Sequence, residues 1–262
     1  MKRFIAFSLG VESTTMCLLY GKGATAIFTD TGSEHQELYA RLQFVEAALK
    51  AHHGGDFELQ VLKPAKVVNG VLCHSLGEAI EAKKFMPSGQ QRFCTVEWKI
   101  KPMDAFLKSQ GPCELLIGFN ADEEPGQDRT GNLMRCKNVQ YRYPLYEDGY
   151  TRADCKALLA QHGLEPDYPV YMARGGCKWC PFKSIREYKA MYFLDRNTFN
   201  EGRAMEERIQ DRRAKFFAIS SSGRSFQSIA EECENSLFDA AEMALVYKQV
   251  KAAPSCGAFC HR

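Results

Sequence analysis

The chain lacks the features that would bind it to a membrane, or to nucleic acid by charge alone. No apolar run reaches the roughly 18 residues that a membrane-spanning helix needs. The 34 basic and 32 acidic side chains leave a net charge of +2, so overall charge favours no polyanionic partner. The short apolar stretch near the N-terminus ends in a polar turn before it reaches the length of a signal peptide. We therefore expect a cytoplasmic protein that has no membrane partner.

Internal repeats and low-complexity segments are also absent, and the composition, 45% hydrophobic and 25% charged, is that of a globular protein. Cysteine is plentiful: there are eleven, in a sequence without the marks of secretion. A disulfide framework explains them poorly, so metal binding, redox or sulfur chemistry is expected for some of them. We expect plain packing roles for the following cysteines: Cys17, Cys73, Cys113, Cys136 and Cys233.

Short apolar runs alternate with helix-like amphipathic stretches in the first half of the sequence. The runs "RFIAF", "ATAIFTD" and "CELLIGF" predict buried strands of an α/β fold, a doubly wound and mostly parallel sheet with helices on both faces. Charged helical patterns follow from Gly175 onward. We therefore predict an α/β domain over residues 1–174 and a helical C-terminal part over residues 175–262. Ligands of such sheets bind beyond the carboxyl ends of the strands.

The loop "FSLGVES" leaves the first predicted strand, turns through Gly10 and enters a helix. Free backbone N–H groups and the helix dipole at such a turn suit a phosphate, although an ordinary loop with a serine cap explains the spacing equally well. The loop resembles the SGGxDS loop of the PP-loop ATP pyrophosphatases, with Leu9 at a glycine position and Glu12 at an aspartate position. The resemblance implies a catalytic role for Glu12 and nucleotide contacts for these residues: Ser8, Leu9, Gly10, Val11 and Ser13.

Five further segments, in order, resemble the phosphoadenosine phosphosulfate (PAPS) reductase-like proteins of that superfamily, whose nucleotide-binding domain has the HUP-like fold. "DTGSEHQELY" is similar to their DTGxExxxTY segment, which places Asp30 and Thr31 near the ribose or Mg²⁺ and makes Asp30 a catalytic candidate. A simple turn cap explains Asp30 on its own. "GFNADEEPGQDR" resembles a later loop of the family, and the implied nucleotide contacts are Asp122, Glu123 and Arg129.

"RFCTVEWKIKPMDAF" resembles the RxCTxxxKixP stretch of bacterial members and the CCxxRKVxPL segment of the iron–sulfur adenylylsulfate reductases. Cys94 matches the second cysteine of the latter, and Phe93 replaces the first. The resemblance implies that Arg92 and Lys99 bring positive charge to a polyanionic nucleotide. Exposed lysines on a helix are common, so an ordinary surface role is the alternative for Lys99.

"GGCKWCPFKS" places Cys177 and Cys180 on one turn, where two thiolates can chelate a metal. The stretch is similar to the family's aCxxCPf motif, and a thioredoxin-like redox pair is less favoured because the motif follows the sheet. Cys94 would be a third ligand. Cys155, in the helix entry "YPLYEDGYTRADC", which resembles a family segment, is preferred as the fourth over Cys256 and Cys260. The resemblance favours a [4Fe-4S] cluster, and zinc is the alternative.

The chain ends in "CGAFCHR", which loosely matches the Cys-Gly-x-His tail of sulfonucleotide reductases, so Cys256 and Cys260 are also catalytic candidates. The resemblance favours an enzyme that binds ATP or a PAPS-like nucleotide with Mg²⁺ and carries out adenylation-linked sulfur transfer. Its partners would be a sulfur-donor protein and a tRNA or DNA substrate, and the enzyme itself would form a homodimer. The alternatives are a sulfonucleotide reductase, or a non-catalytic nucleotide-binding subunit that associates with nucleic acid and holds structural zinc.

Overall fold

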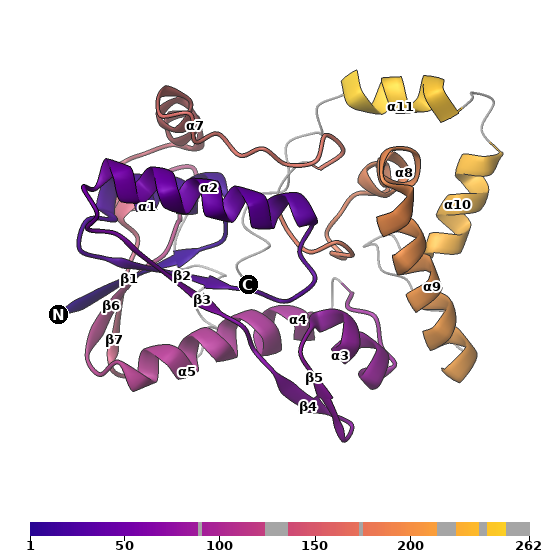
Figure 1. Cartoon of the computed structure of the whole chain (residues 1–262), viewed down its shortest axis with the longest axis horizontal. Coiled ribbons are helices and arrows are strands. Elements are labelled where there is room, and N and C mark those ends of the chain that lie inside the picture. Colours follow the sequence, from indigo (N-terminus) through magenta and orange to yellow (C-terminus); the bar gives the residue numbers. More distant parts are fainter. Residues whose placement is uncertain (89–90, 124–135, 173–174, 214–223, 236–239, 250–262) are drawn as a thin grey trace.

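A computed structural model describes residues 1–88, 91–123, 136–172, 175–213, 224–235 and 240–249. Its centre is a five-stranded sheet in the order β3-β2-β1-β6-β7, and every neighbouring pair is parallel (Figure 1). The strands are β1 (Lys2–Phe7), β2 (Thr25–Thr29), β3 (Glu58–Leu62), β6 (Cys113–Leu116) and β7 (Val139–Arg142). This is a Rossmann-like, HUP-like arrangement, and the predicted α/β fold is confirmed.

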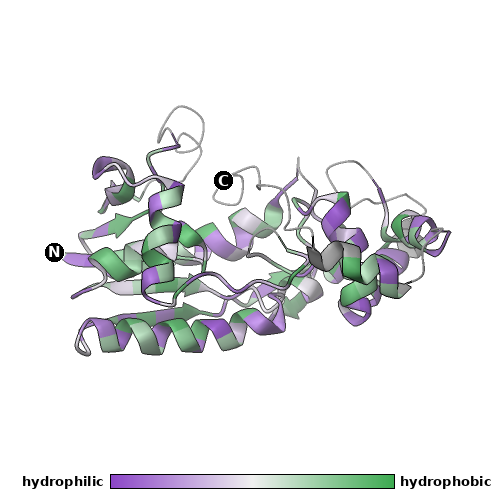
Figure 2. Ribbon diagram, turned by 90° about the horizontal axis from the view of Figure 1, so that it is seen from above, coloured by the Kyte–Doolittle hydropathy of each residue, from purple (hydrophilic) through white to green (hydrophobic). Residues whose placement is uncertain are grey.

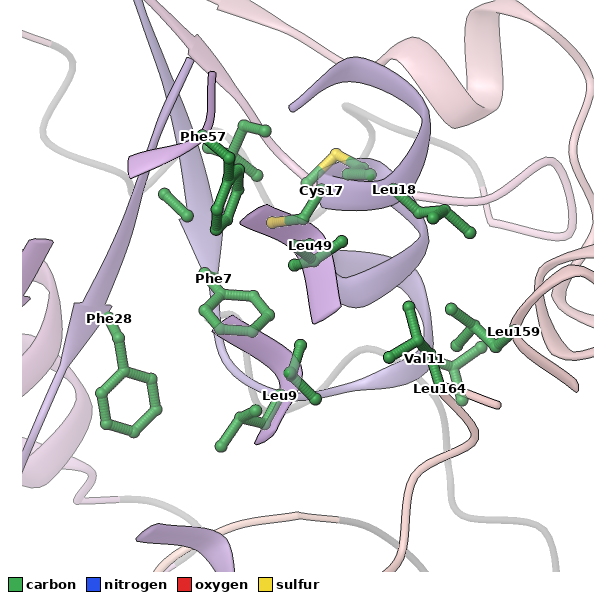
Figure 3. Close-up of a cluster of buried hydrophobic side chains, with 14 of the residues drawn as sticks. Phe7, Leu9, Val11, Cys17, Leu18, Phe28, Leu49, Phe57, Leu159 and Leu164 are labelled. Carbon is green, nitrogen blue, oxygen red and sulfur yellow. The ribbon is translucent and has the colours of Figure 1, made fainter. Parts of the chain in front are cut away.

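Helices cover both faces of this sheet, because its strands are apolar on both sides. The first face is covered by α1 (Val11–Tyr20), α2 (Gln36–His52), the short α6 (Pro144–Glu147) and α7 (Arg152–Gln161). Their apolar side chains form one buried cluster with alternate residues of β1 and β2 (Figure 3). On the opposite face, α5 (Lys101–Ser109) packs Leu107 against Phe4, Ile27 and Leu115. Residues that alternate along each strand thus supply two separate cores.

A single helix in three segments leads into α5. It starts as α4 (Phe93–Thr95), continues as the π-helical segment η1 (Val96–Ile100) and runs on as α5 without a break. A π-helical turn inside an α-helix is uncommon and often occurs at functional sites. Lys99 lies in this turn, and Cys94 lies one turn earlier, in α4. The helix places both residues beside the carboxyl edge of the sheet.

Between β3 and this helix lie a hairpin and a short helix, which the sequence patterns above did not predict. The hairpin strands β4 (Lys66–Val68) and β5 (Val71–Cys73) are antiparallel, and α3 (Leu76–Lys83) follows them. Asn69 and Gly70 both have positive φ, as a two-residue hairpin turn of this kind requires.

The C-terminal part is helical, as predicted. It consists of α8 (Ile185–Leu194), α9 (Arg196–Arg213), α10 (Phe226–Glu234) and α11 (Ala240–Gln249). Its core contains Tyr188, Phe199 and Phe226 together with Ile80 of α3 and Trp98 of η1, so this part shares one apolar cluster with the α/β part. Figure 2 shows hydrophobic ribbon concentrated in the strands, while the helices alternate between hydrophobic and hydrophilic stretches. Within the described part of the chain, every helix is too short or too polar to cross a bilayer.

Candidate functional site

The loop after β1 is tied together by the Ser13 hydroxyl. Ser13 Oγ accepts hydrogen bonds from the backbone N–H groups of Ser8 and Gly10, both at 3.2 Å, and lies 3.3 Å from Ser8 Oγ. Leu9, between them, has φ of 60°, a left-handed conformation that costs a non-glycine residue about 1–2 kcal/mol. Its side chain is buried in the core beneath α1, as Figure 3 shows, and this burial offsets the cost. The leucine therefore takes the backbone conformation that glycine adopts freely.

The loop after β2 contains Asp30 and Thr31. Asp30 Oδ1 accepts hydrogen bonds from the Gly32 N–H and the Tyr39 hydroxyl, both at 2.8 Å. Thr31 is fully buried, and its hydroxyl group donates a hydrogen bond to Glu34 Oε1 at 3.0 Å. Asp30 thus makes the contacts of a turn cap, and its catalytic role stays a prediction.

Glu34 connects this loop to the cysteine turn. Its Oε1 atom lies 3.5 Å from Cys177 Sγ and 3.5 Å from Lys99 Nζ, and the backbones of Glu34 and Cys177 form an isolated antiparallel bridge. Burial, and next the carboxylate of Glu34, raise the pKa of the Cys177 thiol well above its usual value. The sequence analysis selected Asp30 and Thr31 from the DTGSE motif and did not select Glu34.

Hydrogen bonds to backbone carbonyl groups hold the turn from Cys177 to Cys180 in place. Lys183 Nζ donates to the Cys177 carbonyl at 2.7 Å, and the Tyr188 hydroxyl donates to the Cys180 carbonyl at 2.7 Å. Trp179 Nε1 donates to the Thr198 carbonyl at 3.1 Å. Lys183 is a buried cation, which is costly unless negative charge lies nearby. These contacts fix the turn before any ligand binds.

Cys94 approaches this turn from the α4 segment. Electrostatic interactions connect Cys180 with both Cys94 and Cys177, and all three cysteines border the same cavity. Burial, followed by Cys180, raises the pKa of Cys94. The structure therefore brings together three of the four predicted metal ligands.

Cys155 lies elsewhere. It is fully buried among apolar side chains of α1 and α7, and its carbonyl accepts a hydrogen bond from the Thr15 hydroxyl at 3.4 Å. Burial raises the pKa of its thiol to about 11. The structure does not place Cys155 among the cysteines at the cavity, so its position does not support the predicted role of fourth ligand. Cys256 and Cys260 lie outside the described residues.

The predicted acidic residues organise the loop after β6. Glu12 forms an ion pair with Arg152 and accepts a hydrogen bond from the Asn120 side chain. Asp122 accepts the backbone N–H of Arg152 at 2.8 Å, at the start of α7. Glu12 thereby joins α1 to α7, and Arg152, which the sequence analysis did not select, borders the cavity.

Glu123 accepts the Asn120 N–H at 3.4 Å in the same loop, and Arg129 lies outside the described residues. Arg92 stacks its guanidinium over the Phe182 ring, 5.1 Å from the ring centre, and Phe182 borders the cavity. Arg92 thus lies near the cavity, where it contacts the segment that follows the cysteine turn.

One cavity of about 260 Å³ connects these groups. Its lining includes Ser8 to Glu12, from the loop after β1, and the cysteines Cys94, Cys177 and Cys180. Tyr168 lies between them: its hydroxyl donates to the Leu9 carbonyl at 3.3 Å, and its ring contacts the segment that enters the cysteine turn at Gly175. The cavity volume is near the lower end of small-molecule sites, about 300–1,000 Å³.

The side chains at the cavity limit the kind of metal group that the site could hold. Among the residues that the structure describes, no three His, Cys, Asp or Glu side chains form a group that could hold a single metal ion. Tetrahedral zinc, with Zn–S bonds of about 2.3 Å, requires closely spaced sulfur atoms. Cys94, Cys177 and Cys180 border one cavity, and two lysines lie close by: Lys183 donates to the Cys177 carbonyl and Lys99 pairs with Glu34.

No protein-family model matches this chain, and no curated protein is similar enough in sequence to count as a relative.

Proposed function

We propose that the protein is a PP-loop-type enzyme that uses ATP to adenylate an oxygen of its substrate and then replaces that oxygen with sulfur. The observation that carries the proposal is the shared cavity: the anion-suited loop after β1 and the cysteines Cys94, Cys177 and Cys180 border the same space. A nucleotide bound to the first would therefore have its reacting end within the site of the second.

The first step needs only activation of an oxygen. A substrate oxygen attacks the α-phosphorus, the bond from that phosphorus to the β-bridging oxygen breaks, and pyrophosphate leaves. The N–H groups at the N-terminus of α1 and the hydroxyl groups of Ser8 and Ser13 would stabilise the departing charge. Mg²⁺ would shield the phosphates, and Asp30 is the carboxylate that we propose beside it.

The second step exchanges oxygen for sulfur without a change in oxidation state. Hydrosulfide, supplied directly or by a donor protein, attacks the carbon that carries the adenylated oxygen. The carbon–sulfur bond forms, the carbon–oxygen bond breaks, and AMP leaves with the oxygen while the thiol proton is lost to solvent. A cluster held by three protein thiolates keeps one iron able to bind a sulfur atom, and Cys94, Cys177 and Cys180 would hold it.

Release of pyrophosphate from ATP, measured with candidate acceptors including tRNA and DNA, tests the enzyme. Ser13→Ala should weaken ATP binding by about 1–3 kcal/mol, because it removes a hydroxyl donor and the hydrogen bonds that hold the loop from Ser8 to Gly10 in shape. Ser109→Ala, a serine at the exposed end of α5, is the matched control and should bind ATP normally. Sulfite production from a sulfonucleotide would favour the reductase, and ATP binding with no turnover would favour the non-catalytic subunit.

Metal analysis tests the cysteine site separately. Protein purified without oxygen should contain iron and acid-labile sulfide, and Cys177→Ser should lose both. Stoichiometric zinc without iron would refute the cluster while keeping the site, and a metal-free protein would refute the metal centre altogether.

A further inference from the structure

Two buried polar atoms without a hydrogen-bond partner belong to residues at the cavity. They are Thr29 Oγ1 and Asp104 Oδ2. Within the described residues, the other two such atoms belong to His35 and Glu206, neither of which borders the cavity. An unpaired buried polar group costs about 1–3 kcal/mol, and such groups normally have a partner. A ligand in the cavity is a partner that both residues could share.

Both residues line the cavity from elements that pack against each other. Thr29 ends β2, and Asp104 lies on α5, which packs against β2. Apolar residues of the core between the sheet and α5 also border the cavity: Ala6, Met103, Leu115, Ile117 and Phe119. Apolar walls with a few fixed polar groups are the usual composition of a site for a flat heterocycle.

The loop after β1 borders the same cavity and suits phosphate. A ligand that contacts both the loop and this apolar region carries negative charge on one part and a flat, apolar ring on another. We propose that Asp104 and Thr29 form the base-recognition subsite of the nucleotide and select a base with an exocyclic amino group. This inference rests on the proposed function, because it takes the nucleotide to be bound at Ser8 to Ser13.

The chemistry of the pair explains the selection. A carboxylate oxygen accepts a hydrogen bond from an N–H group. The 6-amino group of adenine can donate this hydrogen bond, and an unsubstituted purine cannot. The Thr29 hydroxyl can donate to a ring nitrogen or accept from the amino group. Burial raises the pKa of Asp104, and the neutral carboxyl group could donate to a ring nitrogen while its other oxygen accepts from the amino group.

A chemical double-mutant cycle tests the subsite. The two ligands are ATP and purine riboside triphosphate, which lacks only the amino group, and dissociation constants are measured by calorimetry without turnover. The wild type should bind the purine analogue about tenfold more weakly than ATP, the discrimination that one hydrogen bond gives. In Asp104→Leu the ratio should fall to about one. Thr29→Val should reduce it in part.

Glu206→Gln is the matched control, because Glu206 is another buried carboxylate with an unpaired oxygen but lies away from the cavity. It should keep the wild-type ratio. Asp104→Asn, which preserves shape and one acceptor, serves where Asp104→Leu does not fold, and it should show an intermediate ratio. A wild-type ratio in the Asp104 and Thr29 variants, with ATP still bound, would overturn the subsite alone. A wild type that binds neither nucleotide would overturn the proposed function as well.

Discussion

The carboxylate of Glu34 lies 3.5 Å from the sulfur of Cys177, and it joins the loop after β2 to the cysteine turn that opens the helical part of the chain. The same oxygen forms an ion pair with Lys99 and accepts a hydrogen bond from the Thr31 hydroxyl group. Three segments far apart in sequence therefore meet at one nearly buried oxygen atom.

Glu34→Ala should loosen that junction. The change leaves the buried Thr31 hydroxyl without its acceptor and removes the partner of Lys99, so we expect a loss of about 1–3 kcal/mol in the free energy of unfolding. Urea unfolding measures the loss, and limited proteolysis should cut the C-terminal helices sooner than in the wild type. Glu37→Ala, an exposed neighbour in the first turn of α2, is the control. Equal protease resistance in the wild type and Glu34→Ala would show that the junction holds without Glu34.

The position of Cys155 leads to a prediction about the fourth metal ligand. Cys155→Ala should keep the full iron content, because its side chain is buried between α1 and α7 and lies apart from the cavity cysteines. It should lower the free energy of unfolding by about 1 kcal/mol through the lost packing. Cys94→Ala should lose the metal. Iron and sulfide assays with a thermal melt measure both effects, and loss of iron in Cys155→Ala would return Cys155 to the ligand set.

The sequence predicted the elements whose signals are local. The runs around Ile5, Ile27 and Leu115 became the central strands β1, β2 and β6, because apolar runs between amphipathic stretches are specific to a covered parallel sheet. The hairpin at Asn69-Gly70 was missed, although an Asn-Gly pair between apolar runs is a recognised signal.

Site contacts were harder to predict, because they depend on packing between distant segments. A cysteine in a helix has the same sequence signal in a core as in a metal site, so Cys155 could not be assigned from its pattern. The approach of Glu34 to Cys177 and the unpaired oxygen of Asp104 likewise appear only when separate elements pack together.

Leu9 allows a test of how burial offsets backbone strain. Leu9→Gly removes strain of about 1–2 kcal/mol but also the burial of a leucine, about 1.5–3 kcal/mol, so a small net loss of stability is expected. Leu9→Ala loses most of the burial and keeps the strain, so it should be the less stable of the two. Urea unfolding of both variants gives the comparison. Leu9→Ala as stable as Leu9→Gly would mean that the left-handed conformation costs nothing here.

Glu206 should make stability depend on pH. It is buried on α9, where one carboxylate oxygen accepts the Phe226 N–H at 2.7 Å and the other has no partner. Burial raises the pKa of Glu206 to about 8, whereas glutamate in an unfolded chain titrates at about 4.3. Between those pH values the native state binds more protons than the unfolded state, so this group lowers the free energy of unfolding as pH rises. The contribution of Glu206 to the free energy of unfolding is greatest below the pKa of the unfolded chain, about 4.3. It falls as pH rises toward the pKa of the folded state, about 8, and stays constant above that pH.

Glu206→Gln keeps the shape of the side chain and removes its ionisation. The free energy of unfolding of the wild type relative to Glu206→Gln should therefore fall steadily as pH rises from about 5 to about 8, by up to about 1.4 kcal/mol per pH unit, and then level off. Urea unfolding across this range gives the difference between the two proteins, in which every other titrating group cancels. Glu232→Gln is the control, because ion pairs with Lys189 and Arg224 lower the pKa of Glu232. Glu232 is therefore ionised in both the folded and the unfolded state across this range, and the difference between the wild type and Glu232→Gln should stay constant. A difference between the wild type and Glu206→Gln that stayed constant from pH 5 to 8 would mean that Glu206 has the same proton affinity in both states, and that water or a cation reaches its unpaired oxygen.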